Sequence, residues 1–88
     1  MYAIELKPKA ARFISAQSKK IQRQLITHIE ALAANPRPAG SKLLYTQGKL
    51  YRIRSGNYRI IYQIRDKILL VVIVRVGDRK DIYRHLGK

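Results

Sequence analysis

The centre of the sequence reads Leu50-Tyr-Arg-Ile-Arg-Ser-Gly-Asn-Tyr-Arg-Ile-Ile-Tyr62. Apolar side chains alternate with arginines on both sides of a Ser-Gly-Asn turn signal, which is the pattern of two strands joined in a hairpin. Because successive side chains of a strand point to opposite faces of the sheet, one face of this hairpin is apolar and the other is cationic. The stretch therefore predicts a sheet that packs on a core through one face and leaves an arginine-rich face open.

Further strands are predicted on both sides of this hairpin. Lys42 to Tyr45 opens the strand-rich half of the chain, and the apolar run Ile68-Leu-Leu-Val-Val-Ile-Val74 predicts a buried strand. Turn signals at Gly48, Ser55-Gly56-Asn57 and Asp66-Lys67 follow one another at intervals of about ten residues, which is typical of an antiparallel meander.

The first half of the chain predicts a strand followed by two helices. Tyr2 to Leu6 alternates as a strand does, and Pro8 suits the first turn of a helix that extends from Lys9 to Ala16. Ser18 is the expected N-cap of a second helix that ends at Asn35-Pro36. Apolar residues of this second helix recur at helical spacing: Ile21, Leu25, Ile29, Leu32 and Ala33.

Together these elements predict a single α+β domain that spans residues 1–88. An N-terminal strand precedes two helices, which are expected to pack on one face of a small antiparallel sheet. A short helix or tail from Asp81 to Lys88 is expected to end the chain. A domain of this length has a limited core and room for one site.

The charge of the chain is strongly unbalanced, with 19 Lys and Arg against 5 Asp and Glu and a formal net charge of +14. Such a charge attracts polyanions, so nucleic acid, an acidic protein or both are the expected partners. Without cysteine the chain has no disulfide or thiolate metal site, and its few carboxylates do not suggest a metal pair, so no cofactor is expected. The sequence lacks a signal-peptide pattern and a long apolar run, which predicts a cytoplasmic protein without a membrane span.

The arginines of the predicted strands are expected to converge on the open face. Arg52, Arg54 and Arg59 alternate with the apolar residues of the hairpin. In the following strand Arg75 is expected on the same face, opposed to four apolar residues on the helix face: Leu70, Val72, Val74 and Val76.

Two simpler interpretations of these arginines remain open. Alternating arginines are common on the solvated face of a half-buried sheet, and Arg75 could instead pair with Asp78 or Glu5. Like charges on neighbouring strands repel each other, however, and such a cluster is usually tolerated where an anion is bound.

Arg79 and Tyr83 add a cation and a phenol beyond the last predicted strand. Arginines stabilise a developing phosphorane through forked hydrogen bonds, and neighbouring cations favour the phenolate of a tyrosine. The set suits phosphoryl transfer without a metal, in which an RNA 2′-hydroxyl attacks the adjacent phosphate and leaves a cyclic phosphate. His28 is expected on the helix surface, whereas His85 is a candidate for contact with substrate.

The chain closely resembles the RelE branch of the RelE/ParE toxin superfamily in two segments, Tyr51–Tyr62 and Val74–Tyr83, and also at Asn35-Pro-Arg37 and Lys42-Leu43. The resemblance covers nearly the whole chain. It implies a RelE-like, microbial ribonuclease-like fold and the toxin of a type II toxin–antitoxin pair. Members of this branch are endoribonucleases, or mRNA interferases, that enter the ribosomal A site, cut messenger RNA and so inhibit translation.

The resemblance also implies roles for individual residues. Arg59 and Arg79 fall on the family's phosphate-stabilising arginines, and Tyr83 falls on the tyrosine that helps to activate the 2′-hydroxyl or to orient the base. Arg52 and Arg54 fall on a basic pair that is lysine in the best-known member, where one lysine is a proposed general base; arginine is a poor base at neutral pH. Further cations are candidates for contact with RNA or the ribosome: Lys7, Lys9, Arg12, Lys19, Lys20, Arg23, Lys42, Arg75 and His85.

The partners implied by the resemblance are the ribosome with its messenger RNA and an acidic antitoxin of the RelB type. Operator DNA would be bound only through the antitoxin. Two alternatives remain open: a ParE-type inhibitor of DNA gyrase without nuclease activity, and an inactive family member that binds nucleic acid.

Overall fold

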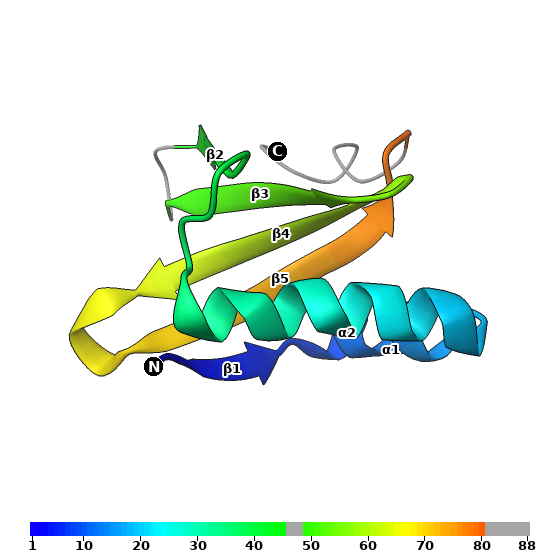
Figure 1. Cartoon of the computed structure of the whole chain (residues 1–88), viewed down its shortest axis with the longest axis horizontal. Coiled ribbons are helices and arrows are strands. Elements are labelled where there is room, and N and C mark those ends of the chain that lie inside the picture. The colour runs from blue at the N-terminus through cyan, green and yellow to red at the C-terminus, as the bar shows by residue number, and fades with distance from the viewer. Residues whose placement is uncertain (46–48, 81–88) are drawn as a thin grey trace.

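The computed structural model describes residues 1–45 and 49–80 of the chain. Figure 1 shows a sheet with two helices on one side of it. The elements follow the order β1 (Ala3–Leu6), α1 (Pro8–Ser15), α2 (Lys19–Ala34), β2 (Lys42–Tyr45), β3 (Leu50–Ser55), β4 (Tyr58–Arg65), the short 3₁₀ helix η1 (Asp66–Ile68) and β5 (Leu70–Asp78). None of the helices described is long and apolar enough to cross a membrane.

The strands form one sheet in the order β1-β5-β4-β3-β2. Strands β2 to β5 are antiparallel neighbours, whereas β1 pairs with β5 in parallel, with Ala3 opposite Leu70. The predicted α+β class, the N-terminal strand and the two helices on one face are confirmed. The sheet is mixed rather than purely antiparallel, because β1 runs parallel to β5. The segment between these two strands provides the long connection that parallel neighbours require. The turn expected at Gly48 and the tail expected from Asp81 to Lys88 lie outside the described residues.

Local sequence signals place both helices as expected. Pro8 is the first residue of α1, where its missing N–H does no harm. The Ser18 hydroxyl accepts the Ile21 N–H at 3.3 Å and so caps α2. α2 ends at Ala34, immediately before Asn35, as the following proline predicts.

The hydrophobic core lies between the helices and one face of the sheet. α1 contributes Ala10 and Ile14, and α2 contributes Leu25, Ile29 and Leu32, all of them buried. They pack against buried residues of the strands: Ile53, Ile60, Tyr62, Ile64, Val71, Ile73 and Val76. The apolar sides of the two helices therefore cover the sheet face that the alternation of residues in the hairpin predicts to be apolar.

A β-bulge shifts the pairing of β4 with β5. Ile61 lies opposite Arg75 and Tyr62 lies opposite Ile73, so Val74 is an extra residue on β5. The expected helix-facing set Leu70, Val72, Val74 and Val76 is therefore wrong; the β5 residues in the helix-side core are Val71, Ile73 and Val76. The bulge returns Arg75 to the open face, because its partner Ile61 lies outside the helix-side core.

The apolar run expected as a strand from residue 68 begins instead in a turn. Ile68 is 64% exposed and Leu69 is 50% exposed. Leu69 has a φ of 52°, a left-handed conformation that reverses the chain between β4 and β5. The prediction of a buried strand is thus wrong for these two residues. β5 begins at Leu70, and Val71, Val72 and Ile73 are buried, whereas Val74 is half-buried.

An ion pair connects η1 to the exit of α2. Arg37 donates to both carboxylate oxygens of Asp66, at 3.3 and 2.8 Å, and the Tyr2 hydroxyl donates to the same carboxylate at 2.6 Å. The Arg37 guanidinium also lies 5.6 Å from the centre of the Tyr51 ring. The hydrogen bonds from Arg37, followed by the one from Tyr2, lower the pKa of Asp66 to about 2.

We expect Asp66→Asn to lower the Tm at neutral pH by an amount that shrinks in acid. Because its folded-state pKa lies below the ordinary value of 3.8, this carboxylate stabilises the fold above that value, and the contribution is lost as the pH falls through about 2. Thermal unfolding followed by circular dichroism between about pH 7 and about pH 2 measures the effect. Glu30→Gln, on the exposed side of α2, is the control. A Tm difference for Asp66→Asn that does not change with pH would contradict the prediction.

Candidate functional site

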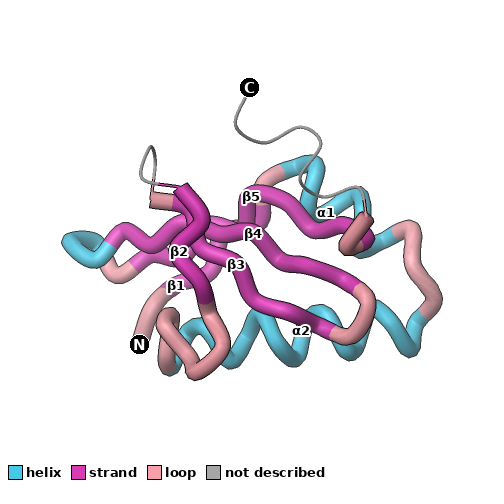
Figure 2. The backbone as a smooth tube through the Cα atoms, turned by 90° about the horizontal axis from the view of Figure 1, so that it is seen from above, coloured by secondary structure: helices cyan, strands magenta, loops and turns pink. Residues whose placement is uncertain are grey.

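Two cross-strand rows of basic residues lie on the sheet face that the helices leave uncovered. Figure 2 shows β3, β4 and β5 side by side. Residues directly opposite each other on neighbouring strands point to the same face. In the first row Lys42, Arg52, Ile61 and Arg75 are successive partners on β2, β3, β4 and β5. The pairing of the strands thus brings three cations into line across the sheet.

Arg59 is the buried cation of the second row. In this row Arg54, Arg59 and Gly77 are successive partners on β3, β4 and β5. Arg59 is only 8% exposed, and its Nη1 donates to the Tyr58 carbonyl at 3.2 Å. Gly77 adds no side chain to the row, so the row consists of one buried and one exposed guanidinium.

No carboxylate forms an ion pair with Arg59 within residues 1–45 and 49–80. The ion pairs in these residues join Arg37 to Asp66 at 2.8 Å and Lys7 to Glu5 at 3.8 Å. Burying a cation costs free energy unless an anion or a full set of hydrogen bonds compensates for it. Arg59 therefore marks a place where a bound anion would supply the missing counter-charge.

The carboxylates expected as alternative partners of Arg75 are engaged elsewhere. Glu5 pairs with Lys7, and the Asp78 carboxylate accepts the Lys80 amide at 3.0 Å. Neither forms an ion pair with Arg75 in the part of the chain that the structure describes.

The open face is also more than a solvated row of arginines. Ile61 and Val72 lie outside the helix-side core, yet they are 0% and 3% exposed. Ile61, Val72 and Arg59 are thus buried on the open face, and the Arg59 guanidinium is partly removed from water. A cation in such a position interacts more strongly with an anion than one in bulk solvent does.

Arg79 follows β5 at the same end of the sheet as the second row. Its amide donates to the Asn57 carbonyl at 3.1 Å, which fixes the backbone of Arg79 beside the turn between β3 and β4. Arg54 precedes this turn and Arg59 follows it. Three predicted site arginines thus lie around one end of the β3–β4 hairpin.

The basic residues of the helical layer lie on the other side of the sheet (Figure 1). Lys9 and Arg12 belong to α1, Lys19, Lys20 and Arg23 belong to α2, and Lys7 directly precedes α1. All six are exposed. The structure therefore separates these predicted RNA-contacting residues from the arginine rows, and the protein presents cations on two opposite sides. Tyr83 and His85 lie outside the described residues.

One polar group near the site escaped the sequence analysis. His28 is exposed, as expected, but its Nδ1 lies 2.6 Å from the hydroxyl oxygen of Ser55, the residue after Arg54. The Gln24 amide nitrogen donates to the Ser55 carbonyl at 2.9 Å. The only signal in the sequence was the spacing of four residues between Gln24 and His28, which places both on one face of α2.

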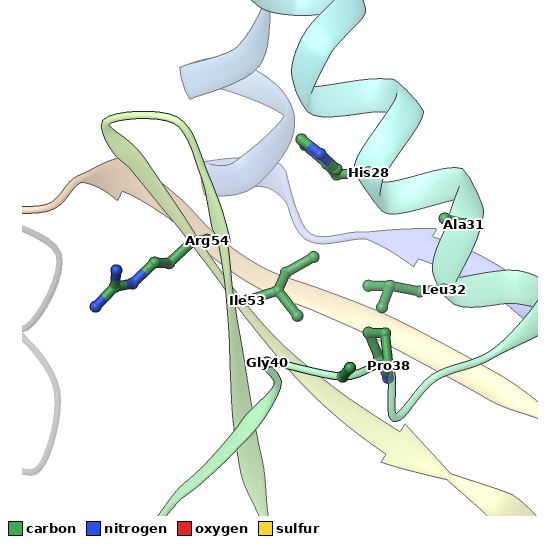
Figure 3. Close-up of a pocket in the computed structure, with 8 residues that line it drawn as sticks. His28, Ala31, Leu32, Pro38, Gly40, Ile53 and Arg54 are labelled. Carbon is green, nitrogen blue, oxygen red and sulfur yellow. The ribbon is translucent and has the colours of Figure 1, made fainter.

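A pocket of about 320 Å³ lies next to this polar group, between α2, the Pro38–Gly40 loop and β3. In Figure 3 Leu32 and Ile53 point into it, whereas the Arg54 side chain points away from α2. The pocket is therefore mainly apolar, and the guanidinium of Arg54 belongs to the open face. Among the described residues no three His, Cys, Asp or Glu side chains are grouped so as to hold a metal ion.

The fold and the two rows define the protein as a small, basic α+β domain with an arginine-lined sheet face. Residues 4–83 match the sequence profile of the family described as ParE toxin of type II toxin-antitoxin system, parDE. The match covers most of the chain, and the protein therefore belongs to this toxin family.

Individual relatives agree with this assignment. Toxin RelG of Mycobacterium tuberculosis is 40% identical over 53 residues, which are 60% of this chain and 61% of that toxin, so the aligned part is less than two thirds of the relative. The toxin–antitoxin complex RelBE2 of the same organism matches with a TM-score of 0.76 at 27% identity, over 89% of this chain and 98% of the other. The archaeal RelE–RelB complex from Pyrococcus horikoshii has the same fold, with a TM-score of 0.79 at 24% identity over 89% and 94% of the two chains. The predicted RelE branch of the RelE/ParE superfamily is thus confirmed, and the chain is a type II toxin.

Proposed function

We propose that this toxin is an endoribonuclease that cuts messenger RNA in the ribosomal A site, without a metal ion, and thereby inhibits translation. The observation that carries the proposal is Arg59, a guanidinium that is only 8% exposed and has no carboxylate partner among the described residues. A phosphate of RNA is the anion that best fits such a position, because its oxygens accept forked hydrogen bonds from arginine.

In the proposed reaction the RNA 2′-oxygen forms a bond to the adjacent phosphorus while the bond from phosphorus to the 5′-oxygen breaks. The 2′-hydroxyl gives up a proton and the leaving 5′-oxygen gains one, so the products carry a 2′,3′-cyclic phosphate and a 5′-hydroxyl. Arg59 and Arg79 would stabilise the charge that develops on the phosphorane, and Arg52 and Arg54 would add to the field. Tyr83 would assist proton transfer or orient the base. The four arginines are poor bases at neutral pH, so they are assigned to charge stabilisation and not to proton abstraction.

Cations lie on two opposite sides of the protein, which suits binding between two RNA strands. The open face would hold the messenger RNA, with Lys42 and Arg75 extending the first row. The helical layer would contact ribosomal RNA through six residues: Lys7, Lys9, Arg12, Lys19, Lys20 and Arg23. The net charge of +14 also suits an acidic, RelB-like antitoxin in the cytoplasm, which would cover the basic surface and alone contact operator DNA.

Inhibition of DNA gyrase is the second candidate function. It is favoured by one observation, the description of the matching family as the ParE toxin of parDE systems. It does not account for a buried arginine on the open face that forms no ion pair with a carboxylate of the described residues, which is why we rank it second.

Primer extension on a defined messenger RNA tests the proposal, using purified toxin with and without programmed ribosomes and with a metal chelator present. We expect cuts at A-site codons that require ribosomes and persist in the chelator. Failure of folded, growth-inhibiting protein to cut RNA in either condition would overturn the proposal, and inhibition of supercoiling by the same protein would then select the gyrase function. RNA binding with a steep salt dependence but without cut products or toxicity would indicate an inactive family member.

A further inference from the structure

Three polar side chains join α2 to the end of β3. Ser55 is 1% exposed, and its hydroxyl oxygen lies 2.6 Å from His28 Nδ1 and 3.3 Å from Gln24 Nε2. Gln24 Nε2 also donates to the Ser55 carbonyl at 2.9 Å. Figure 3 shows His28 directed from α2 toward β3. Gln24, His28 and Ser55 are termed the polar clasp.

The hydrogen bonds of the clasp are mutually consistent. The amide nitrogen of Gln24 can only donate, so the Ser55 hydroxyl oxygen accepts from it. The hydroxyl can also form a hydrogen bond with His28 Nδ1, either by donating its hydrogen or by accepting with its second lone pair. A buried hydroxyl that is satisfied on both sides fixes the position of its residue more tightly than apolar packing alone, because displacing it leaves polar atoms unpaired.

The clasp holds the turn between β3 and β4. Gly56 in this turn has a φ of 63°, and a Cβ atom built on it would lie only 2.7 Å from Gln24 Nε2. The turn therefore sits directly against the Gln24 amide, and a side chain at Gly56 would push the two apart. On its far side the turn offers the Asn57 carbonyl to the Arg79 amide at 3.1 Å.

Two site arginines depend on this turn through the backbone. Arg54 immediately precedes Ser55 on β3, and Arg79 is hydrogen-bonded to Asn57. The Gln24 and His28 side chains belong to the helical layer, so neither is part of the arginine rows. Any influence of the clasp on RNA must therefore act through the position of Arg54 and Arg79.

We propose that the polar clasp positions Arg54 and Arg79 for phosphate binding, so that Gln24 and His28 are positioning residues of the nuclease site. The expected effect of the clasp on cleavage rests on the proposed function, whereas its expected effect on the turn does not. A displacement of about 1 Å at a reacting group lowers a rate by about 100-fold, so a loosened turn is expected to reduce cleavage by about tenfold or more.

Gln24→Met tests the proposal, because methionine keeps the length and helix propensity of the side chain and removes the amide. The matched control is Gln22→Met on the same helix, since the Gln22 amide donates to the Gln17 carbonyl at 2.9 Å, in the connection between the helices and away from the turn. The first measurement is hydrogen exchange of the Arg79 amide by NMR. We expect faster exchange in Gln24→Met and no change in Gln22→Met.

The Lys7 amide separates a local effect from general destabilisation. It donates to the Ile73 carbonyl at 3.0 Å in the β1–β5 part of the sheet, so only a global loss of stability accelerates its exchange as much as that of Arg79. Acceleration confined to Arg79 supports the clasp. Equal acceleration of both amides, or none, overturns it.

The second measurement is single-turnover cleavage on programmed ribosomes. A positioning defect in Gln24→Met lowers the rate at saturating toxin by about tenfold, whereas partial unfolding raises the toxin concentration needed for saturation and leaves the saturating rate unchanged. An unchanged saturating rate would overturn the proposed role. If the wild-type toxin cuts no RNA, the proposed function fails. The exchange of the Arg79 amide then decides alone whether the clasp holds the turn and the backbone of Arg79 in position.

Discussion

Arg59→Met is expected to abolish measurable RNA cleavage while leaving the free energy of unfolding unchanged or higher. Arg59 is only 8% exposed and lacks a carboxylate partner in the described residues, so its desolvated charge is compensated there only by a hydrogen bond to the Tyr58 carbonyl. Replacing such a charge by an apolar side chain of similar volume is often neutral or stabilising. Losing one donor to a charged transition state typically lowers the rate by about 10²–10³. Activity and stability should therefore change independently or in opposite directions.

Urea denaturation and primer extension on programmed ribosomes measure the two effects. Arg65→Met is the matched control, because Arg65 lies on the same strand and the same face but is exposed at the opposite end of β4. The control should change neither quantity strongly. A large loss of stability in Arg59→Met would show that Arg59 has a structural partner, and full activity would remove it from the site.

Arg79→Ala and Tyr83→Phe are each expected to relieve growth inhibition without loss of the fold. The backbone of Arg79 lies beside the β3–β4 turn, at the same end of the sheet as Arg59, and the family resemblance assigns Tyr83 to the 2′-hydroxyl. Phenylalanine keeps the aromatic ring of Tyr83 and removes only the hydroxyl. Loss of toxicity in Tyr83→Phe would thus assign the residue to proton transfer rather than to base stacking.

Growth after induction, at equal expression checked by immunoblot, measures both variants. Lys67→Ala in η1 is the control, since it removes one positive charge from an exposed turn outside the arginine rows. Toxicity that persists fully in both Arg79→Ala and Tyr83→Phe would refute the assignment. A loss of toxicity in Lys67→Ala as large as in Arg79→Ala would attribute toxicity to total charge.

Local chemistry explains the parts of the fold that the sequence predicts well. Ser18 caps α2 because its hydroxyl has a fixed geometric role, and Ser55-Gly56-Asn57 turns the chain because Gly56 takes a positive φ at little cost. Alternation in β3 and β4 assigns the faces of these strands correctly, since each strand is regular over its whole length.

Features that depend on tertiary pairing are not visible in the sequence. Because Val74 is an extra residue, the side chains that follow it on β5 point to the opposite face from the one that alternation continued from the residues before it predicts. Nothing in a run of β-branched residues indicates where such a bulge occurs. The parallel pairing of β1 and the hydrogen bond between His28 and Ser55 each join distant segments. The burial of Arg59 between Arg54 of β3 and Gly77 of β5 likewise depends on strand pairing, and the sequence presents it as one arginine among many.

The pairing of β1 with β5 also bears on when the toxin becomes active during its own synthesis. Ala3 can meet Leu70 only after the ribosome has made almost all of the described chain, and contacts between such distant residues form slowly. Arg75 and Arg79 are made later still, so a nascent chain carries no complete arginine surface. The topology thus delays assembly of this surface until Leu70 and the residues that follow it have been made. An antitoxin produced alongside is expected to encounter the emerging polypeptide before that surface is assembled.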